Sequence, residues 1–245
     1  MSISPLLSDI KLMSTKLNQL SFIGEVAYIY NPLEYAWNPH ENFLLKYGVG
    51  KKHVLFLGMN PGPYGMVQTG VPFGEVEIVK NWLKIDGEVN QPEIVHPKRP
   101  IQGFDCPKSE VSGKRFWGMM ADRFPHAQNF FKNAFVVNFC PLVWMTETGK
   151  NITPDKLLKS EMDPVYKICN AHLKTVIEYY QPKIIVGVGA FAEQQVIKLK
   201  NLYFDDKDFK VGRMLHPSPA SPIANKFWPE RAIEELVEMG VWSND

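Results

Sequence analysis

The sequence predicts an α/β fold in which one domain, residues 1–245, is built on a central four-stranded parallel sheet, doubly wound and flanked by helices. Four short aliphatic or β-branched runs are spaced along the chain, and the clearest are nearly continuous in apolar character, as in strands buried on both faces. Segments with helical periodicity lie between these runs, which indicates strand–helix–strand units. A hydrophobic content of 45% over 245 residues is sufficient for one large globular domain.

The four strands are predicted at residues 53–57, 134–137, 183–188 and 210–215. Helices are predicted at residues 75–85, 162–180, 191–199 and 230–239, where apolar residues recur every third or fourth position. Pro182 ends the second of these helices, and the last is expected to cap the sheet. The first fifty residues contain no comparable pattern, and we expect them to form a helical extension packed on the domain.

A turn rich in polar residues, glycine or proline follows each predicted strand. The turns are GMNPG at 58–62, NFCP at 138–141, GVG at 187–189 and HPSP at 216–219. Ligands of open α/β sheets bind beyond the carboxyl ends of the strands, so the four turns are expected to converge on one crevice. The sequence therefore predicts an active site that contains Asn60, Asn138 and His216.

Composition excludes several classes of protein. No apolar run is long enough to span a bilayer and no signal segment opens the chain, so we expect an intracellular protein with no membrane partner. Three widely spaced cysteines fit neither a disulfide framework nor a four-thiolate site, and no histidine spacing indicates a metal. We expect a monomer with reduced cysteines and no cofactor. The net charge of +1 is well below the basic excess that is typical of nucleic-acid-binding domains. A protein with this charge can hold DNA only through a small local surface and backbone N–H groups.

Five motifs resemble those of the single-strand-selective monofunctional uracil-DNA glycosylases, a branch of the uracil-DNA glycosylase superfamily. They are GMNPGPYGMVQTGVPFG at 58–74, VSGKRFWG at 111–118, VVNFCPL at 136–142, TETGKNITP at 146–154 and HPSPASP at 216–222. Their order is that of the family, and they extend over most of the chain from about residue 50 to residue 228. The resemblance implies a uracil-DNA glycosylase-like fold. It also implies a cofactor-free repair enzyme that flips uracil, or a related deaminated or oxidised base, out of DNA and leaves an abasic site.

The resemblance implies roles for individual residues. Asn138 resembles the base-reading asparagine, whose amide can accept a hydrogen bond from uracil N3–H and donate one to O4, the reverse of what cytosine requires. Phe73 resembles the residue that stacks on the flipped base. His216 would donate to O2 as charge develops on the departing base, and backbone N–H groups around Met59 would add to these donors. Asn60 resembles the residue that positions the attacking water.

Gly62 is expected to influence specificity, because the most uracil-restricted branch carries a bulky aromatic at the matching position, which excludes a methyl group at C5. Glycine presents only hydrogen there, so some 5-substituted uracils should enter the pocket. Alternatively, Gly62 permits a tight turn between Pro61 and Pro63. Both interpretations can hold together.

The loop that follows His216 is expected to press into the DNA minor groove. Its candidate DNA-binding residues are Ser218, Pro219, Ala220 and Ser221. Animal members of the family have an arginine soon after HPSP, where this chain has Ala220 and Ser221, so strong wedging is in doubt and a bacterial subgroup is expected. The candidate phosphate contacts are Lys98, Arg99, Lys114, Arg115 and Lys150.

Other readings of the sequence are weaker. GVGAFA at 187–192 fits a loose dinucleotide-binding pattern, but it follows the third strand, and a tight strand-to-helix turn explains it better. A small-molecule nucleoside hydrolase would need ribose-binding acids that the motifs lack, and a non-catalytic reader of damaged bases would be expected to lack Asn60 or His216. The residues leave open the ranking of uracil against hypoxanthine, xanthine and 5-hydroxymethyluracil, and the preferred DNA strandedness.

Overall fold

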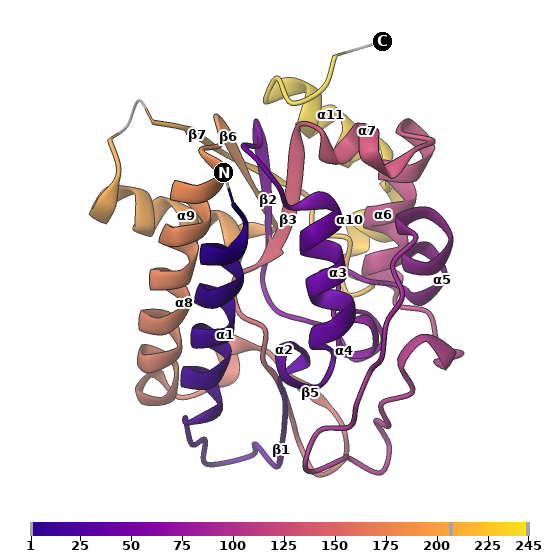
Figure 1. The fold of residues 1–245 in the computed structure, drawn as a ribbon, viewed down its shortest axis with the longest axis vertical. Helices are drawn as coiled ribbons and strands as arrows, with labels where there is room; N and C mark the ends of the chain where they lie inside the picture. The colour runs from indigo at the N-terminus through magenta and orange to yellow at the C-terminus, as the bar shows by residue number, and fades with distance from the viewer. Residues whose placement is uncertain (1, 206–207, 244–245) are drawn as a thin grey trace.

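The main sheet has four parallel strands in the order β3-β2-β6-β7 (Figure 1). The computed structural model describes residues 2–205 and 208–243. The strands are β2 (Val54–Gly58), β3 (Ala134–Asn138), β6 (Ile184–Val188) and β7 (Lys210–Met214). Every residue of β2 and β6 is buried, which is why these two strands read as continuous apolar runs. The predicted α/β fold is confirmed, and each strand lies within one residue of its predicted bounds.

Three of the four predicted helices are regular α-helices: α8 (Lys159–Tyr180), α9 (Ala190–Tyr203) and α11 (Glu230–Glu238). Helix α8 begins three residues earlier than predicted, because the Glu161 carboxylate accepts a hydrogen bond from the Leu158 N–H at 3.0 Å and caps the first turn. The segment predicted as a helix at 75–85 is α5 (Val76–Ile78) continued by a π-helix, η1 (Val79–Leu83). That segment is helical, but it is not one α-helix.

Helices cover both faces of the main sheet (Figure 1). Helices α1 (Ser4–Asn18) and α3 (Trp37–Tyr47) lie in front of the strands in this view, and α10 (Pro222–Phe227) and α11 lie behind them. Helix α9 packs on β6 and β7, and α1 packs along α8. The other helices are α2 (Pro32–Tyr35), α4 (Met66–Thr69), α6 (Val111–Arg123) and α7 (Ala127–Phe131), with 3₁₀ turns η2 (Gly103–Asp105) and η3 (Pro154–Lys156).

A second, antiparallel sheet was not predicted. It consists of β1 (Tyr28–Tyr30), β4 (Val143–Met145) and β5 (Asn151–Ile152), in the order β1-β4-β5. The first fifty residues are therefore helical in α1, α2 and α3 but also supply strand β1. Side chains such as Leu6, Leu17 and Phe43 from this segment are buried in the main hydrophobic core.

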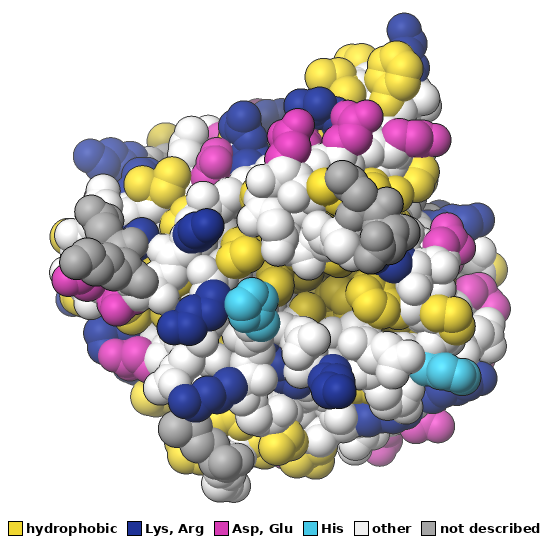
Figure 2. All heavy atoms as spheres, turned by 90° about the horizontal axis from the view of Figure 1, so that it is seen from above, with side chains coloured by type: hydrophobic (Ala, Val, Ile, Leu, Met, Phe, Trp, Pro, Cys, Tyr) yellow, Lys and Arg dark blue, Asp and Glu magenta, His cyan; other side chains and the backbone are white. Residues whose placement is uncertain are grey.

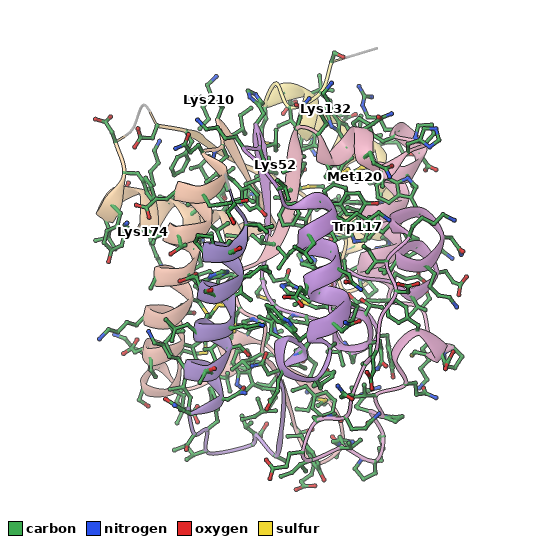
Figure 3. All side chains as sticks on the ribbon, in the orientation of Figure 1. Lys52, Trp117, Met120, Lys132, Lys174 and Lys210 are labelled. Carbon is green, nitrogen blue, oxygen red and sulfur yellow. The ribbon has the colours of Figure 1, made fainter. Side chains whose placement is uncertain are left out.

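The four strands run in one direction, away from the upper end of the molecule. Lys52 and Lys132 precede β2 and β3, Lys210 begins β7, and all three lie in the upper part of Figure 3. The carboxyl ends of the strands therefore point toward the other end of the molecule. Figure 2 shows the upper end from outside, where positive and negative side chains are interspersed.

All three cysteines, Cys106, Cys140 and Cys169, are buried free thiols, in agreement with the sequence prediction. Over residues 2–205 and 208–243, no helix is long and apolar enough to cross a membrane.

Candidate active site

Two predicted site residues, Asn138 and Phe73, lie beside Gly58 at the carboxyl end of β2. Gly58 and Asn138 are paired in the parallel register. A Cβ atom at Gly58 would lie 2.3 Å from Asn138 Oδ1 and 2.7 Å from Cε2 of Phe73. Both distances are shorter than contact permits, so glycine at position 58 allows the amide and the ring to approach the strand end together.

Phe73 has a left-handed backbone, with φ of 54°, which is uncommon for a residue with a bulky side chain. Its ring stacks on Phe116 of α6, with centroids 4.7 Å apart and planes inclined by 20°. Gly113 lets α6 come this close, because a Cβ atom there would lie 2.2 Å from the Phe73 carbonyl oxygen. The packing of α6 therefore holds the Phe73 ring in place before any ligand arrives.

Asn60 lies in the turn after β2, and its amide is oriented by a backbone carbonyl. Its Nδ2 donates to the carbonyl oxygen of Leu142 at 3.1 Å. The turn is tied to the segment after β3 by hydrogen bonds from Phe139 N to Gly58 O, at 2.9 Å, and from Cys140 N to Met59 O, at 3.0 Å. This arrangement leaves Oδ1 of Asn60 as a hydrogen-bond acceptor.

His216 follows β7, and its tautomer is set by its own loop. The backbone N–H of Ser218 donates to Nδ1 of His216 at 3.1 Å, so the proton of the neutral ring lies on Nε2. Burial lowers the pKa of His216, which favours this neutral form at neutral pH. The ring packs against Gly189, where φ is +90° and a Cβ atom would lie 3.1 Å from that of His216. Nε2–H is therefore a donor in a fixed position.

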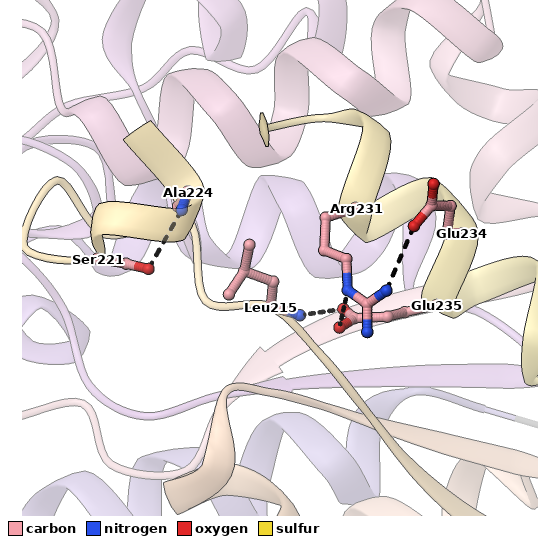
Figure 4. A network of polar contacts seen from close by, with 6 residues as sticks. All are labelled: Leu215, Ser221, Ala224, Arg231, Glu234 and Glu235. Carbon is pink, nitrogen blue, oxygen red and sulfur yellow. Dashed lines mark hydrogen bonds and ion pairs between the residues drawn. The ribbon is translucent and has the colours of Figure 1, made fainter. Parts of the chain in front are cut away.

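Helix α11 supports the strand end just before His216 (Figure 4). Glu235 accepts a hydrogen bond from the Leu215 backbone N–H at 2.5 Å. Arg231 donates to the other carboxylate oxygen of Glu235 at 3.1 Å and also pairs with Glu234. This contact joins the C-terminal helix to the residue that precedes the histidine.

The side chains of Asn60, Phe73, Asn138 and His216 line one cleft with a volume of about 160 Å³. Pockets for drug-sized ligands typically exceed ~300 Å³, so this cleft is suited to a single ring rather than to a large cofactor. The turns after β2, β3 and β7 thus meet at one cleft, as predicted, whereas none of residues 187–189 after β6 lines it. Its lining residues are Met59, Asn60, Pro61, Gly62, Met66, Phe73, Glu110, Ser112, Asn138, Asn151, Thr153, His216 and Ser218.

A family model, that of the uracil DNA glycosylase superfamily, matches residues 45–237. The chain belongs to the uracil-DNA glycosylase superfamily. The single-strand selective monofunctional uracil-DNA glycosylase of Rattus norvegicus is 46% identical over 230 residues, which cover 94% of this chain and 82% of that protein. Its counterpart from Mus musculus is 46% identical over the same share of this chain and 81% of its own.

A solved structure shows the same fold at low sequence identity. The crystal structure of wild-type Pedobacter heparinus SMUG2 superposes with a TM-score of 0.61 at 19% identity, and the match covers 94% of both chains. The uracil-DNA glycosylase-like fold that the sequence predicts is confirmed.

Six residues that line the cleft of this superfamily member were not predicted to do so: Pro61, Met66, Glu110, Ser112, Asn151 and Thr153. Ser112, Asn151 and Thr153 lie within recognised motifs, which contain the signal without assigning a role. Glu110 stands just before a motif, and no sequence pattern marked it. Among the described residues, neither Oε2 of Glu110 nor Oδ1 of Asn151 has a hydrogen-bond partner, although both atoms are buried.

The structure revises the interpretation of Gly62. Its φ is not positive, so the backbone conformation alone does not require glycine. A Cβ atom there would lie 2.7 Å from Oε2 of Glu110 and 2.9 Å from Cδ. The direction expected to be open is therefore filled by the carboxyl group of Glu110.

The predicted DNA-binding residues lie at and around the mouth of the cleft. Ser218 lines the cleft, whereas Pro219 and Ala220 are exposed at the loop tip. Ser221 caps α10, and its hydroxyl accepts a hydrogen bond from the Ala224 N–H at 3.2 Å (Figure 4). Lys114 and Lys150 are exposed and do not line the cleft.

Two arginines considered as phosphate contacts are occupied within the chain. Arg115 donates to the carbonyl oxygen of Pro217 at 3.2 Å and to Oδ1 of Asn225 at 2.9 Å. Arg99 donates to the carbonyl oxygen of Gly149 at 2.8 Å and to the hydroxyl of Tyr64. Arg115 therefore braces the loop that contains His216.

Proposed function

We propose that this protein is a monofunctional uracil-DNA glycosylase of base excision repair. It flips uracil or a related deaminated or oxidised base out of DNA, hydrolyses the N-glycosidic bond and leaves an abasic site. The observation that supports this most directly is the arrangement of Phe73, Asn138, Asn60 and His216 around one ring-sized cleft. A base stacked in DNA is inaccessible to such a cleft, so the target must be extruded or already unpaired.

Asn138 and Phe73 recognise the base in this proposal. The Asn138 amide accepts from N3–H and donates to O4, while the Phe73 ring stacks on the base. In the structure, Nδ2 of Asn138 donates to Sδ of Met66 at 3.4 Å. A thioether is a weak acceptor, so uracil O4 replaces it with little loss.

His216 and Asn60 act on the glycosidic bond. As the bond breaks, negative charge develops on the departing base, and the Nε2–H of His216 donates to O2. A donor placed in this way typically contributes ~3 kcal/mol to transition-state stabilisation. The Oδ1 of Asn60, left as an acceptor by the contact with Leu142, orients the water that attacks the sugar. Backbone N–H groups around Met59 add to the donors near O2.

The exposed loop tip is the part of this enzyme that meets DNA. Pro219 and Ala220 press into the minor groove, with Ser218 and Ser221 at their flanks, while Lys114 and Lys150 contact phosphates. Gly62 faces C5 of the flipped base. An enzyme with this activity acts in the compartment that contains the DNA, which is the cytoplasm of a bacterial cell or the nucleus of a eukaryotic cell.

The test uses oligonucleotides that contain uracil, 5-hydroxymethyluracil, hypoxanthine or xanthine, in single- and double-stranded form. Incubation with the protein should give strand breaks only after alkali, at least for uracil, because the abasic site is left intact. No described lysine lines the cleft, so sodium borohydride should trap no covalent adduct. Absence of alkali-labile sites with every lesion would refute the proposed activity, and a trapped adduct would refute monofunctional chemistry.

A further inference from the structure

The turn after β2 carries a tyrosine whose hydroxyl is shared by two cations. Tyr64 stands two residues after Gly62, which lines the cleft. Arg99 donates to the Tyr64 hydroxyl through Nη1, and Lys108 donates to the same oxygen through Nζ at 3.2 Å. Both charged groups also lie over the ring, with Cζ of Arg99 at 5.4 Å and Nζ of Lys108 at 4.9 Å from its centroid. Two positive charges are therefore gathered next to the cleft.

Arg99 is fixed in place by the main chain around it. Its Nε donates to the Gly149 carbonyl oxygen at 2.8 Å, and its backbone N–H donates to the His96 carbonyl oxygen at 2.9 Å. Its own carbonyl oxygen accepts from the Tyr30 hydroxyl at 2.8 Å. A guanidinium that is already oriented in this way loses little conformational entropy when it binds a ligand.

The two cations have no acidic partner within the chain. In residues 2–205 and 208–243, no ion pair involves Arg99 or Lys108, and Nη2 of Arg99 has no hydrogen-bond partner. Arginine and lysine only donate, so the Tyr64 oxygen accepts from both and its own proton is available to a further acceptor. The three side chains thus form a group of donors with two positive charges, which an anion with several oxygens would complete.

The carboxyl group of Glu110 is the opposing charge on this turn, because it lies against Gly62 and Gly65. Burial raises its pKa to about 7, against the opposing effect of the Tyr64 and Gly65 backbone N–H groups. Near neutral pH the group is therefore partly protonated, and it repels an anion less than a permanent negative charge would.

We propose that Tyr64, Arg99 and Lys108 form a binding site for one backbone phosphate of the DNA strand that carries the damaged base. The inference rests on the proposed function, in which that strand delivers its base to the adjacent cleft. The phosphate oxygens accept from the Tyr64 O–H, from Nη2 of Arg99 and from the Lys108 ammonium, and the planar guanidinium matches phosphate geometry. Because the site contacts one strand, it acts on single-stranded DNA as well as on a duplex.

The first measurement is the affinity for a short single strand with a central tetrahydrofuran, an abasic analogue with no base to excise, by fluorescence anisotropy at several salt concentrations. Lys108→Met should weaken binding by about threefold to tenfold and lower the salt slope by about 0.7. Tyr64→Phe keeps the ring and removes one donor, so it should weaken binding by about threefold with little change in slope. Lys132→Met, which removes an exposed lysine at the opposite end of the sheet, is the matched control and should bind like wild type.

A scan of neutral methylphosphonate linkages identifies the phosphate. One linkage near the abasic position should weaken binding to wild type by about threefold to tenfold, but binding to Lys108→Met by less than about twofold, because one partner of that phosphate is already absent. Tyr64→Phe gives the same comparison if thermal melts show that Lys108→Met is unfolded. If the losses are additive at every linkage in both variants, these residues contact no backbone phosphate and the proposal is overturned.

Two further observations separate the alternatives. If inorganic phosphate at constant ionic strength raises the Tm of wild type more than that of Lys108→Met, while the methylphosphonate losses are additive, the site binds a free anion and its assignment to DNA is overturned. If wild type excises none of the lesions, the proposed function fails. If it excises uracil but the losses are additive, the phosphate site is overturned while the glycosylase activity stands.

Discussion

Asn60 and His216 are each oriented at one end by a hydrogen bond to the main chain. Nδ2 of Asn60 donates to a carbonyl and Nδ1 of His216 accepts from an N–H, so Oδ1 of Asn60 and Nε2–H of His216 are an acceptor and a donor for the reaction that we propose. Groups held in this way need no reorganisation when charge develops, which is the main source of electrostatic catalysis.

We therefore expect His216→Ala and Asn60→Ala each to lower single-turnover excision of uracil by about a hundredfold or more, since each removes a transition-state contact. DNA affinity, measured by fluorescence anisotropy, should change little. His126→Ala, which removes an exposed histidine, is the control and should keep the wild-type rate. Near-normal excision by both site variants would show that the chemistry is assigned to the wrong residues.

The contact between Gly62 and Glu110 gives a second prediction at this scale. Gly62→Ala places a methyl group 2.7 Å from Oε2, so the carboxyl must move, and uracil excision should fall by about tenfold. In a Glu110→Ala background the same substitution should cost much less, with a coupling energy of about 0.5–3 kcal/mol. The measurement is a double-mutant cycle on single-turnover rates, and strictly additive effects would contradict the contact.

The residues predicted from sequence were those with a motif around them. Asn138 ends β3 and His216 follows β7, and both strands were recognisable from the sequence, so their convergence followed from the rule for parallel sheets. Glu110 reaches the cleft only because two glycines in a distant turn leave room for it. That dependence is a property of three-dimensional packing and has no local sequence pattern.

At the scale of elements, α6 and the loop after β7 are joined by Arg115. Its guanidinium donates to the Pro217 carbonyl oxygen in that loop and to Oδ1 of Asn225 in α10. The Trp228 Nε1–H donates to the Arg115 carbonyl oxygen at 3.1 Å. The neighbouring Lys114 is exposed on the same helix. Arg115 therefore makes its hydrogen bonds within the protein, whereas the side chain of the adjacent Lys114 is exposed to solvent.

Arg115→Met keeps the aliphatic stem but removes these hydrogen bonds, so we expect His216 to lose its support and the excision rate to fall by about tenfold, with ~1–2 kcal/mol less stability. Lys114→Met is the paired control. It should leave the rate at saturating DNA unchanged, weaken DNA binding for all sequences and lower the salt slope by about one. Equal behaviour of the two variants would contradict the division of roles on α6.

The elements that the sequence did not predict are short. Strands β1, β4 and β5 have three, three and two residues, too few for an alternating pattern to emerge. Their apolar residues, such as Val143 and Trp144, are buried on both sides and resemble any core segment. The π-helical turn at Val79–Leu83 was also beyond prediction, because it keeps the apolar spacing of an α-helix while changing its hydrogen bonds.

For the molecule as a whole, His40 links stability to pH. It is buried in α3, and its ring contacts the Gly70 carbonyl oxygen through Nδ1 at 2.7 Å. Burial lowers its pKa to about 4, with a smaller contribution from His172, while the bond to Gly70 opposes the shift. Between about pH 4 and 6.5 the unfolded chain binds more protons at this site, so the contribution of His40 to stability falls as the pH decreases.

We expect the free energy of unfolding in urea to include a loss of up to about 3 kcal/mol from His40 between pH 7 and pH 4. His40→Gln should remove much of this loss. Glu110 has the opposite sign, because its raised pKa stabilises the protein at low pH and the benefit disappears as the pH rises through about 7. The contribution of His40 is therefore the difference between the unfolding free energies of wild type and His40→Gln at each pH. Parallel pH profiles of the two unfolding free energies would exclude a contribution from His40.

The burial of all three cysteines has a practical consequence for experiments in solution. Buried thiols react slowly, so a cysteine introduced at an exposed position becomes the preferred target for a maleimide dye. Lys132 is such a position, because it is exposed and lies at the end of the sheet away from the cleft. A fluorophore attached there should follow the tumbling of the enzyme as it encounters DNA, scans it and dissociates, without entering the space where the base is cut.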